Sequence, residues 1–94
     1  MSELTKAKRV ERAQRVRDFL ADEYVSEALR RMEAENHKAF LSADTDEARR
    51  NAWAEARALE RFSAKLAGMM GDGDRARDEI RREAPRSPTP EPPQ

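Results

Sequence analysis

Apolar residues recur every three or four positions over most of this chain, a spacing that places side chains on one face of an α-helix. Between residues 22 and 41 a stripe is formed by Val25, Leu29 and Met32. A second, between residues 46 and 70, is formed by Ala48, Ala52, Leu59, Phe62, Leu66 and Met69. The pattern therefore predicts two amphipathic helices, 22–41 and 46–70, of similar length.

Capping residues indicate where these helices begin, because the first 67 residues contain neither Gly nor Pro. Asp22 precedes Glu23, which supplies an N-cap followed by an acidic first turn. Residues 42–47 have low helix propensity, and Asp44 and Glu47 are spaced like a capping box. We expect a loop there, and a short loop between two such helices predicts an antiparallel hairpin.

Further helices are expected on either side of the hairpin. Helix formers fill residues 3–20, which predicts an N-terminal helix. Gly71 is expected to end the long helix as its C-cap, and Asp74 to cap a short last helix over 74–82. All five prolines lie in residues 85–94, which predicts a disordered tail. The predicted fold is all-α, with one helical domain, 1–84.

Little in the composition supports catalysis. Sixteen of the apolar residues are alanine, which disfavours a roomy enclosed active site. The chain has no cysteine, and its single histidine, His37, has no metal-ligand spacing around it. No serine has a glycine-flanked elbow, and the three glycines form no phosphate-binding loop. We therefore predict no enzyme activity, no catalytic, metal or cofactor-binding residues, no cofactor and no small-molecule substrate.

The predicted helices have more apolar surface than two of them can cover. Two packed amphipathic helices leave part of each stripe exposed, and Trp53 is offset from the main stripe. We expect self-association or a larger partner; the alternative is a marginal monomer with the N-terminal helix folded over the hairpin. The predicted interface residues are Val25, Leu29, Met32, Trp53, Leu59, Phe62, Leu66 and Met69.

Charge is balanced over the whole chain, with 19 basic and 19 acidic residues, but it is unevenly distributed. The first 17 residues carry six basic side chains and two acidic ones, whereas residues 18–47 carry three basic and nine acidic ones. A basic N-terminal helix is the basis of an alternative hypothesis, a nucleic-acid-binding accessory in genome packaging or transcriptional control. It would use Lys6, Lys8, Arg9, Arg12, Arg15 and Arg17. The same helix could instead pair with the acidic segment of its own or a neighbouring subunit.

No apolar stretch approaches the roughly 20 residues needed to span a bilayer, and the N-terminal helix offers only Leu4, Val10 and Val16 for insertion, so we expect no membrane partner. Because the chain has no cysteine, a reducing cytoplasm is the expected compartment.

The order of these elements resembles that of small helical proteins encoded by tailed bacteriophages and prophages. The resemblance covers roughly residues 15–80. It rests on Phe19, Leu20, Ala21 and Asp22, on Glu27, Ala28 and Leu29, on the acidic turn 44–47, on Ala58, Leu59, Phe62 and Leu66, and on the Gly-Asp-Gly run. It implies a non-enzymatic virion component or assembly accessory, whose partner is itself or a larger virion protein, in the host cytoplasm or the virion.

Overall fold

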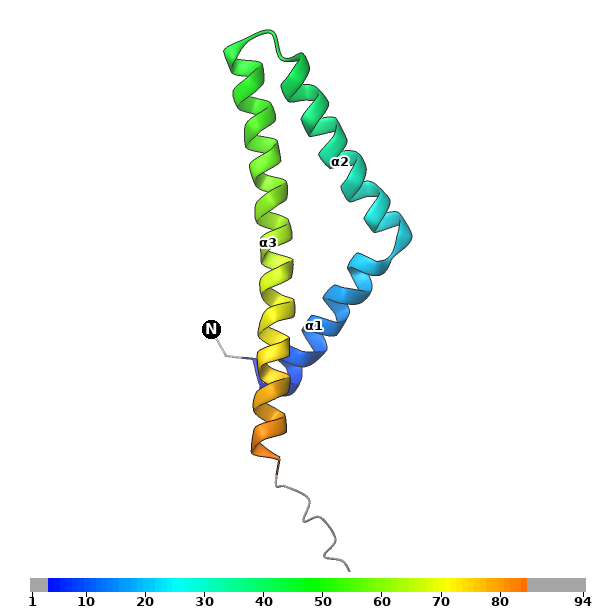
Figure 1. Ribbon diagram of the computed structural model, residues 1–94, viewed down its shortest axis with the longest axis vertical. Helices are drawn as coiled ribbons and strands as arrows, with labels where there is room; N and C mark the ends of the chain where they lie inside the picture. The colour runs from blue at the N-terminus through cyan, green and yellow to red at the C-terminus, as the bar shows by residue number, and fades with distance from the viewer. Residues whose placement is uncertain (1–3, 85–94) are drawn as a thin grey trace, which may run out of the picture.

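The computed structural model describes residues 4–84, and the tail predicted over 85–94 lies outside this range. All regular structure in the described residues is helical (Figure 1). Helix α1 spans Lys6–Ala21, α2 spans Glu23–Ser42 and α3 spans Asp46–Glu83. The all-α prediction is confirmed for this part of the chain.

The breaks between the helices are made by polar side chains, as the sequence predicts. Asp22 lies between α1 and α2, and its carboxylate accepts hydrogen bonds from the backbone N–H of Tyr24 at 2.9 Å and of Val25 at 3.0 Å. The second break is a loop over residues 43–45. There the cap is Thr45, whose hydroxyl accepts from the backbone N–H of Ala48 at 3.0 Å, and not Asp44.

The predicted end of the long helix at Gly71 is wrong. Helix α3 continues through Gly71 and Asp74 without a turn and ends at Glu83. Its C-cap is Ala84, whose N–H donates to the carbonyl of Ile80. No glycine in the described part of the chain has a positive φ, so none forms the left-handed helix cap that was expected. The separate short helix over 74–82 is therefore the last part of one 38-residue helix, about 57 Å long.

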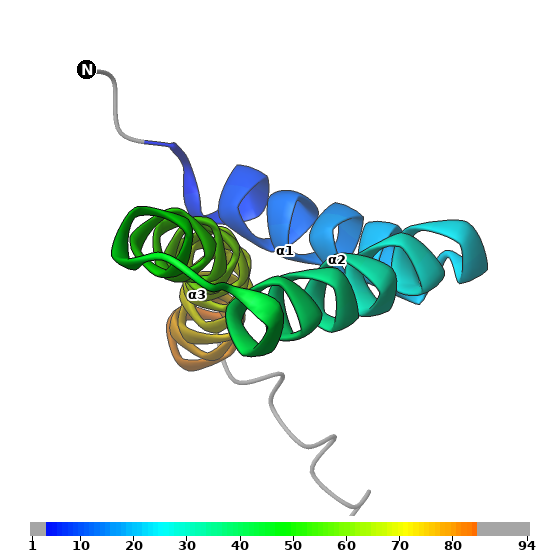
Figure 2. The ribbon, with the colours of Figure 1, turned by 90° about the horizontal axis from the view of Figure 1, so that it is seen from above.

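The three helices form an open frame. Figure 1 shows α2 and α3 meeting at the loop and diverging from it, while α1 runs from the break at Asp22 back to the C-terminal half of α3. Seen from above, α1 and α2 extend to the same side of α3 (Figure 2). Helix α1 contacts α3 more extensively than α2 does, so the main packing is not within the expected hairpin.

Small side chains make up what is buried in this frame. The buried apolar residues of the described range are Ala13, Val16, Ala52 and Ala76, and Gly73 is buried with them. No large side chain there is fully buried. In contrast, Tyr24 is 72% exposed, Leu41 70% and Trp53 59%. The apolar residues of this single chain are thus mostly left in contact with water.

Candidate interaction surface

Helix α1 crosses α3 at a point where both backbones come close. A Cβ atom placed on Gly73 would lie 2.2 Å from the Cβ of Ala13 and 2.9 Å from the carbonyl oxygen of Arg9. Carbon atoms in contact are normally about 3.5–4.0 Å apart, so only glycine fits here. Ala13 and Ala76 are completely buried beside it. The Gly-Asp-Gly run thus provides a packing site within α3.

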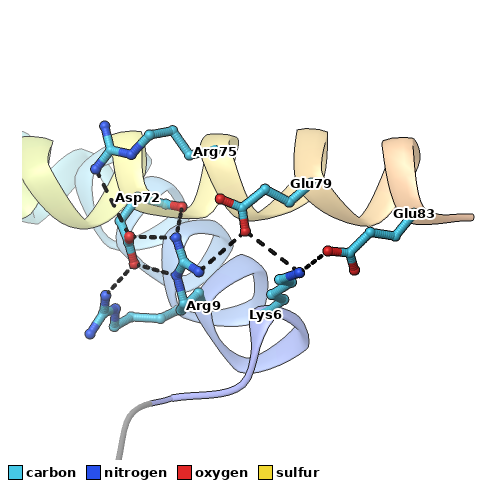
Figure 3. A network of polar contacts seen from close by, with 7 residues as sticks. Lys6, Arg9, Asp72, Arg75, Glu79 and Glu83 are labelled. Atoms are coloured by element: carbon cyan, nitrogen blue, oxygen red, sulfur yellow. Dashed lines mark hydrogen bonds and ion pairs between the residues drawn. The ribbon is translucent and has the colours of Figure 1, made fainter.

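Ion pairs surround this crossing. Arg9 binds the carboxylate of Asp72 through two nitrogens, Nε to Oδ2 at 2.9 Å and Nη2 to Oδ1 at 2.7 Å (Figure 3). Arg12 donates to the same carboxylate at 2.9 Å. The hydrogen bond from Arg9, with the positive charges of Arg9, Arg12 and Arg75, holds the pKa of Asp72 below its usual value, although desolvation opposes this shift. Asp72 is therefore the acid on which α1 is anchored.

A second group of charges continues the contact toward the C-terminal end of α3. Lys6 pairs with Glu83 and lies 3.8 Å from Glu79, which is also 3.8 Å from Arg9 (Figure 3). The hydrogen bond to Glu83, together with the charges of both glutamates, raises the pKa of Lys6. The N-terminal end of α1 is thereby held against α3.

All six basic residues singled out in the sequence take part in ion pairs. Besides Lys6, Arg9 and Arg12, Arg17 reaches α3 by pairing with Asp74 at 2.6 Å. Lys8 and Arg15 each lie 3.1 Å from Glu11 within α1, and the hydrogen bond from Lys8 lowers the pKa of Glu11. The acids that α1 meets on another helix belong to residues 72–83 and not to the segment 18–47 that the charge distribution suggested.

None of the eight predicted interface residues is buried. Met32, Trp53 and Phe62 are exposed, at 47%, 59% and 45%. The other five are half-buried, namely Val25, Leu29, Leu59, Leu66 and Met69. The structure does not gather all eight on one surface but distributes most of them over separate hollows along α3.

Two of these hollows share Phe62. One is formed where α1 approaches α3, and Phe19, Phe62 and Leu66 line it together with the charged Arg12 and Arg15. The other lies between α2 and α3 and is lined by Leu29, Met32 and Phe62. Phe62 lines both, and it remains 45% exposed because neither helix closes over it.

A third hollow, which we call the Trp53 face, is also formed by α2 and α3. Its apolar lining consists of Phe40, Ala52, Trp53, Ala56 and Leu59, and its volume is about 540 Å³. The polar residues around it are Glu33, Asn36, His37, Glu60 and Ser63. The guanidinium of Arg57 lies 5.4 Å from the centre of the Trp53 ring, which positions the ring by a cation–π contact.

Sequence reasoning did not include Phe40 in the interface, although it is 46% exposed next to Trp53. Met32, Asn36 and Phe40 are spaced four residues apart and therefore follow one face of α2. That spacing is the signal that could have identified Phe40. Polar Asn36 and His37 interrupt the stripe, which made it difficult to recognise.

In residues 4–84, no charged or polar residue is buried, and no three metal-ligating side chains are close enough to hold an ion. None of the three helices is both long enough and apolar enough to cross a membrane. No family model, curated protein or solved structure matches this chain.

Proposed function

We propose that this protein works by binding another protein surface through the Trp53 face, and that it does not catalyse a reaction. The observation that carries this proposal is the exposure of Trp53 and Phe40 in one hollow, at 59% and 46%. Exposed apolar residues gathered in one patch mark sites of protein interaction, whereas scattered ones are ordinary. Tryptophan is also among the residues that contribute most energy at such sites.

The exposed aromatic area can contribute substantially to the free energy of binding. An aromatic side chain buries about 150–250 Å² when it is fully covered, so covering Trp53 would remove roughly 100–150 Å² from water. At about 25 cal/mol per Å², this corresponds to about 3 kcal/mol for this side chain. Phe40 would add somewhat less, because a smaller part of it is exposed.

The ion pairs of α1 weigh against the nucleic-acid alternative. Binding to a phosphate backbone requires Lys and Arg side chains that neutralise phosphates and so release the counterions held by the nucleic acid. Lys6, Arg9, Arg12 and Arg17 are instead paired with acids of α3, and a phosphate would have to compete with those carboxylates. These ion pairs therefore favour protein binding over nucleic-acid binding as the function of the chain.

The resemblance to helical proteins of tailed phages suggests particle assembly as the setting. On this proposal the chain is a virion component or assembly accessory, and its partner is itself or a larger particle protein. Sequencing of the neighbouring genes tests this setting. Genes for capsid, portal or tail proteins would support it, whereas a repressor or nuclease gene beside an isolated copy would contradict it.

A photo-crosslinking amino acid tests the proposed surface directly. Placed at position 53 in the cells that make the protein, it should form covalent adducts with a protein. The same amino acid at Ala54, which is also exposed but is rotated by about 100° around α3, is the matched control and should form few. Equal yields at both positions, or no adduct at position 53, would contradict a specific surface there.

A further inference from the structure

We infer that the occupant of the Trp53 face is a second copy of this chain, docked so that the two α3 helices run antiparallel. This inference rests on the proposed function and specifies its partner. The two-fold axis crosses the seam between the two α3 helices midway between Trp53 and Ala56, in the N-terminal half of α3, and Ala54 points away from this seam. Each copy thereby places its α3 in the hollow that α2 and α3 of the other copy form.

A stripe of side chains along α3 supplies the register. Arg49, Trp53, Ala56, Glu60 and Ser63 follow one another at alternating intervals of four and three residues. This is the spacing of a coiled-coil seam, which keeps successive side chains on one line along a helix. The last four of these residues all line the Trp53 face, so the stripe and the hollow coincide.

Two copies of this stripe that run in opposite directions are complementary to each other. In the antiparallel register, Trp53 lies opposite the partner's Ala56, so the largest side chain of the stripe meets the smallest. Arg49 lies opposite the partner's Glu60, which sets a positive charge against a negative one. The two-fold axis repeats both contacts, so the dimer has two pairs of each kind. Charge complementarity of this kind fixes orientation and register between protein surfaces.

The ion pairs that Arg49 and Glu60 make within one chain are weak enough for both residues to pair with a second chain instead. Arg49 pairs with Asp46 at 2.6 Å, and Glu60 lies 3.6 Å from Arg57. Both pairs join residues three positions apart on an exposed helix surface, where ion pairs contribute little. The side chains of Arg49 and Glu60 are 49% and 71% exposed, so a second chain can reach them.

The exposed aromatic rings provide part of the area that a dimer needs. From their exposed fractions, Trp53 and Phe40 of the two copies together present roughly 400 Å² of aromatic surface. Stable protein interfaces bury about 1,200–2,000 Å² in total, so these rings would provide about a third of the lower limit. Ala56 and Leu59, which are half-buried, and the polar residues at the edge of the hollow add to this area. The rest of the contact would come from exposed residues of α2 and α3 beside the hollow. The assembly then has α2 and α3 of both copies side by side, as in a four-helix bundle.

Charge reversal tests the register. Arg49→Glu places two acids opposite each other at both ends of the seam, and Glu60→Arg places two bases there. We expect each single change to raise the dimer dissociation constant at least about tenfold, measured by sedimentation equilibrium. The double variant Arg49→Glu/Glu60→Arg restores opposite charges and should return to within about threefold of the unmodified chain. In one chain the two residues are 11 positions apart on α3 and share no contact, so a local effect cannot produce this restoration.

Arg50→Glu is the matched control for Arg49→Glu, because it reverses the next arginine, which points about 100° away from Arg49. We expect it to leave the dissociation constant within about threefold. The inference is overturned if the unmodified chain remains monomeric to about 100 µM, or if the double variant associates no better than the single ones.

Photo-crosslinking from position 53 distinguishes a failure of the proposed dimer from a failure of the proposed protein-binding function. Adducts with another copy support both, whereas adducts only with a different protein refute the second copy and leave the proposed function standing.

Discussion

Replacing Gly73 with alanine tests the close approach of α1 and α3. The added Cβ would lie 2.2 Å from the Cβ of Ala13 and 2.9 Å from the backbone oxygen of Arg9, so α1 would have to move away by more than about 1 Å. Overpacking of this kind costs about 1–3 kcal/mol. Because the contacts are with backbone and Cβ atoms that cannot rotate away, we expect the upper end of that range.

The helix itself would gain from the same change. Alanine is more favourable than glycine in a helix interior by about 1 kcal/mol, which offsets part of the clash. The expected result for Gly73→Ala is thus a net loss of about 2 kcal/mol in the free energy of unfolding.

Gly68 provides the matched control for this substitution. It lies in the same helix, five positions earlier, and a Cβ placed on it meets no heavy atom within 4 Å. Gly68→Ala should therefore stabilise the chain by about 0.8–1 kcal/mol, through helix propensity alone. Both substitutions change the unfolded chain in the same way, so the difference between them, about 3 kcal/mol, reports the contact with α1.

Urea unfolding followed by circular dichroism measures both variants, at one low protein concentration so that association does not contribute. We expect Gly73→Ala to lower the free energy of unfolding and Gly68→Ala to raise it. If Gly73→Ala stabilised the chain as much as Gly68→Ala does, α1 would not lie against Gly73, and the arrangement described here would be wrong.

Three further outcomes are expected. The pKa of Asp72 is depressed by its arginine partners, so its contribution to stability is complete above its usual value of 3.8 and is lost as the pH falls below it. The difference in urea midpoint between the unmodified chain and Asp72→Asn should accordingly be constant from about pH 5 to 7 and shrink below about pH 4. Asp22→Ala removes the N-cap of α2 and should cost about 1 kcal/mol by thermal unfolding, whereas Asp22→Asn should keep most of that stability. Fluorescence anisotropy should show no binding of duplex DNA at about 50 mM salt, because four of the six basic residues of α1 are paired with α3; tight binding that weakens steeply with salt would contradict this.

Local signals were sufficient to predict where most helices begin. Asp22 caps α2 and α3 begins at Asp46, because short-range hydrogen bonds and helix propensity decide these positions. The N-terminal end of α3 was predicted although the capping residue is Thr45, since several residues of the loop are able to serve as a cap. Information of this kind is contained within a few neighbouring residues.

The continuation of α3 through Gly71 and Gly73 could not be predicted in this way. Two glycines and two aspartates within four positions ordinarily indicate the end of a helix. Here the missing side chain of Gly73 makes room for Ala13, and Asp72 binds Arg9 and Arg12. These contacts join residues about 60 positions apart, so nothing near the glycines indicates them. The same long-range packing of α1 on α3 replaced the expected hairpin as the main contact of the fold.

Membership of the proposed interaction surface was predictable only in part. Trp53 was identified because its position is offset from the main apolar stripe, and it is indeed exposed. The four-residue spacing from Met32 to Phe40 places Phe40 on an apolar face of α2, but it could not show that Phe40 and Trp53 line one hollow while Met32 and Phe62 line another. The angle at which α2 diverges from α3 decides which residues share a surface.

The emission of Trp53 on dilution tests most directly whether a second chain covers this surface. The chain contains a single tryptophan, so its fluorescence reports this site alone. We expect blue-shifted emission that is protected from acrylamide at high concentration, and a shift to red, readily quenched emission as dilution separates the copies. Blue-shifted, protected emission in a sample that sedimentation shows to be monomeric would mean that one chain already buries Trp53, and would contradict the account.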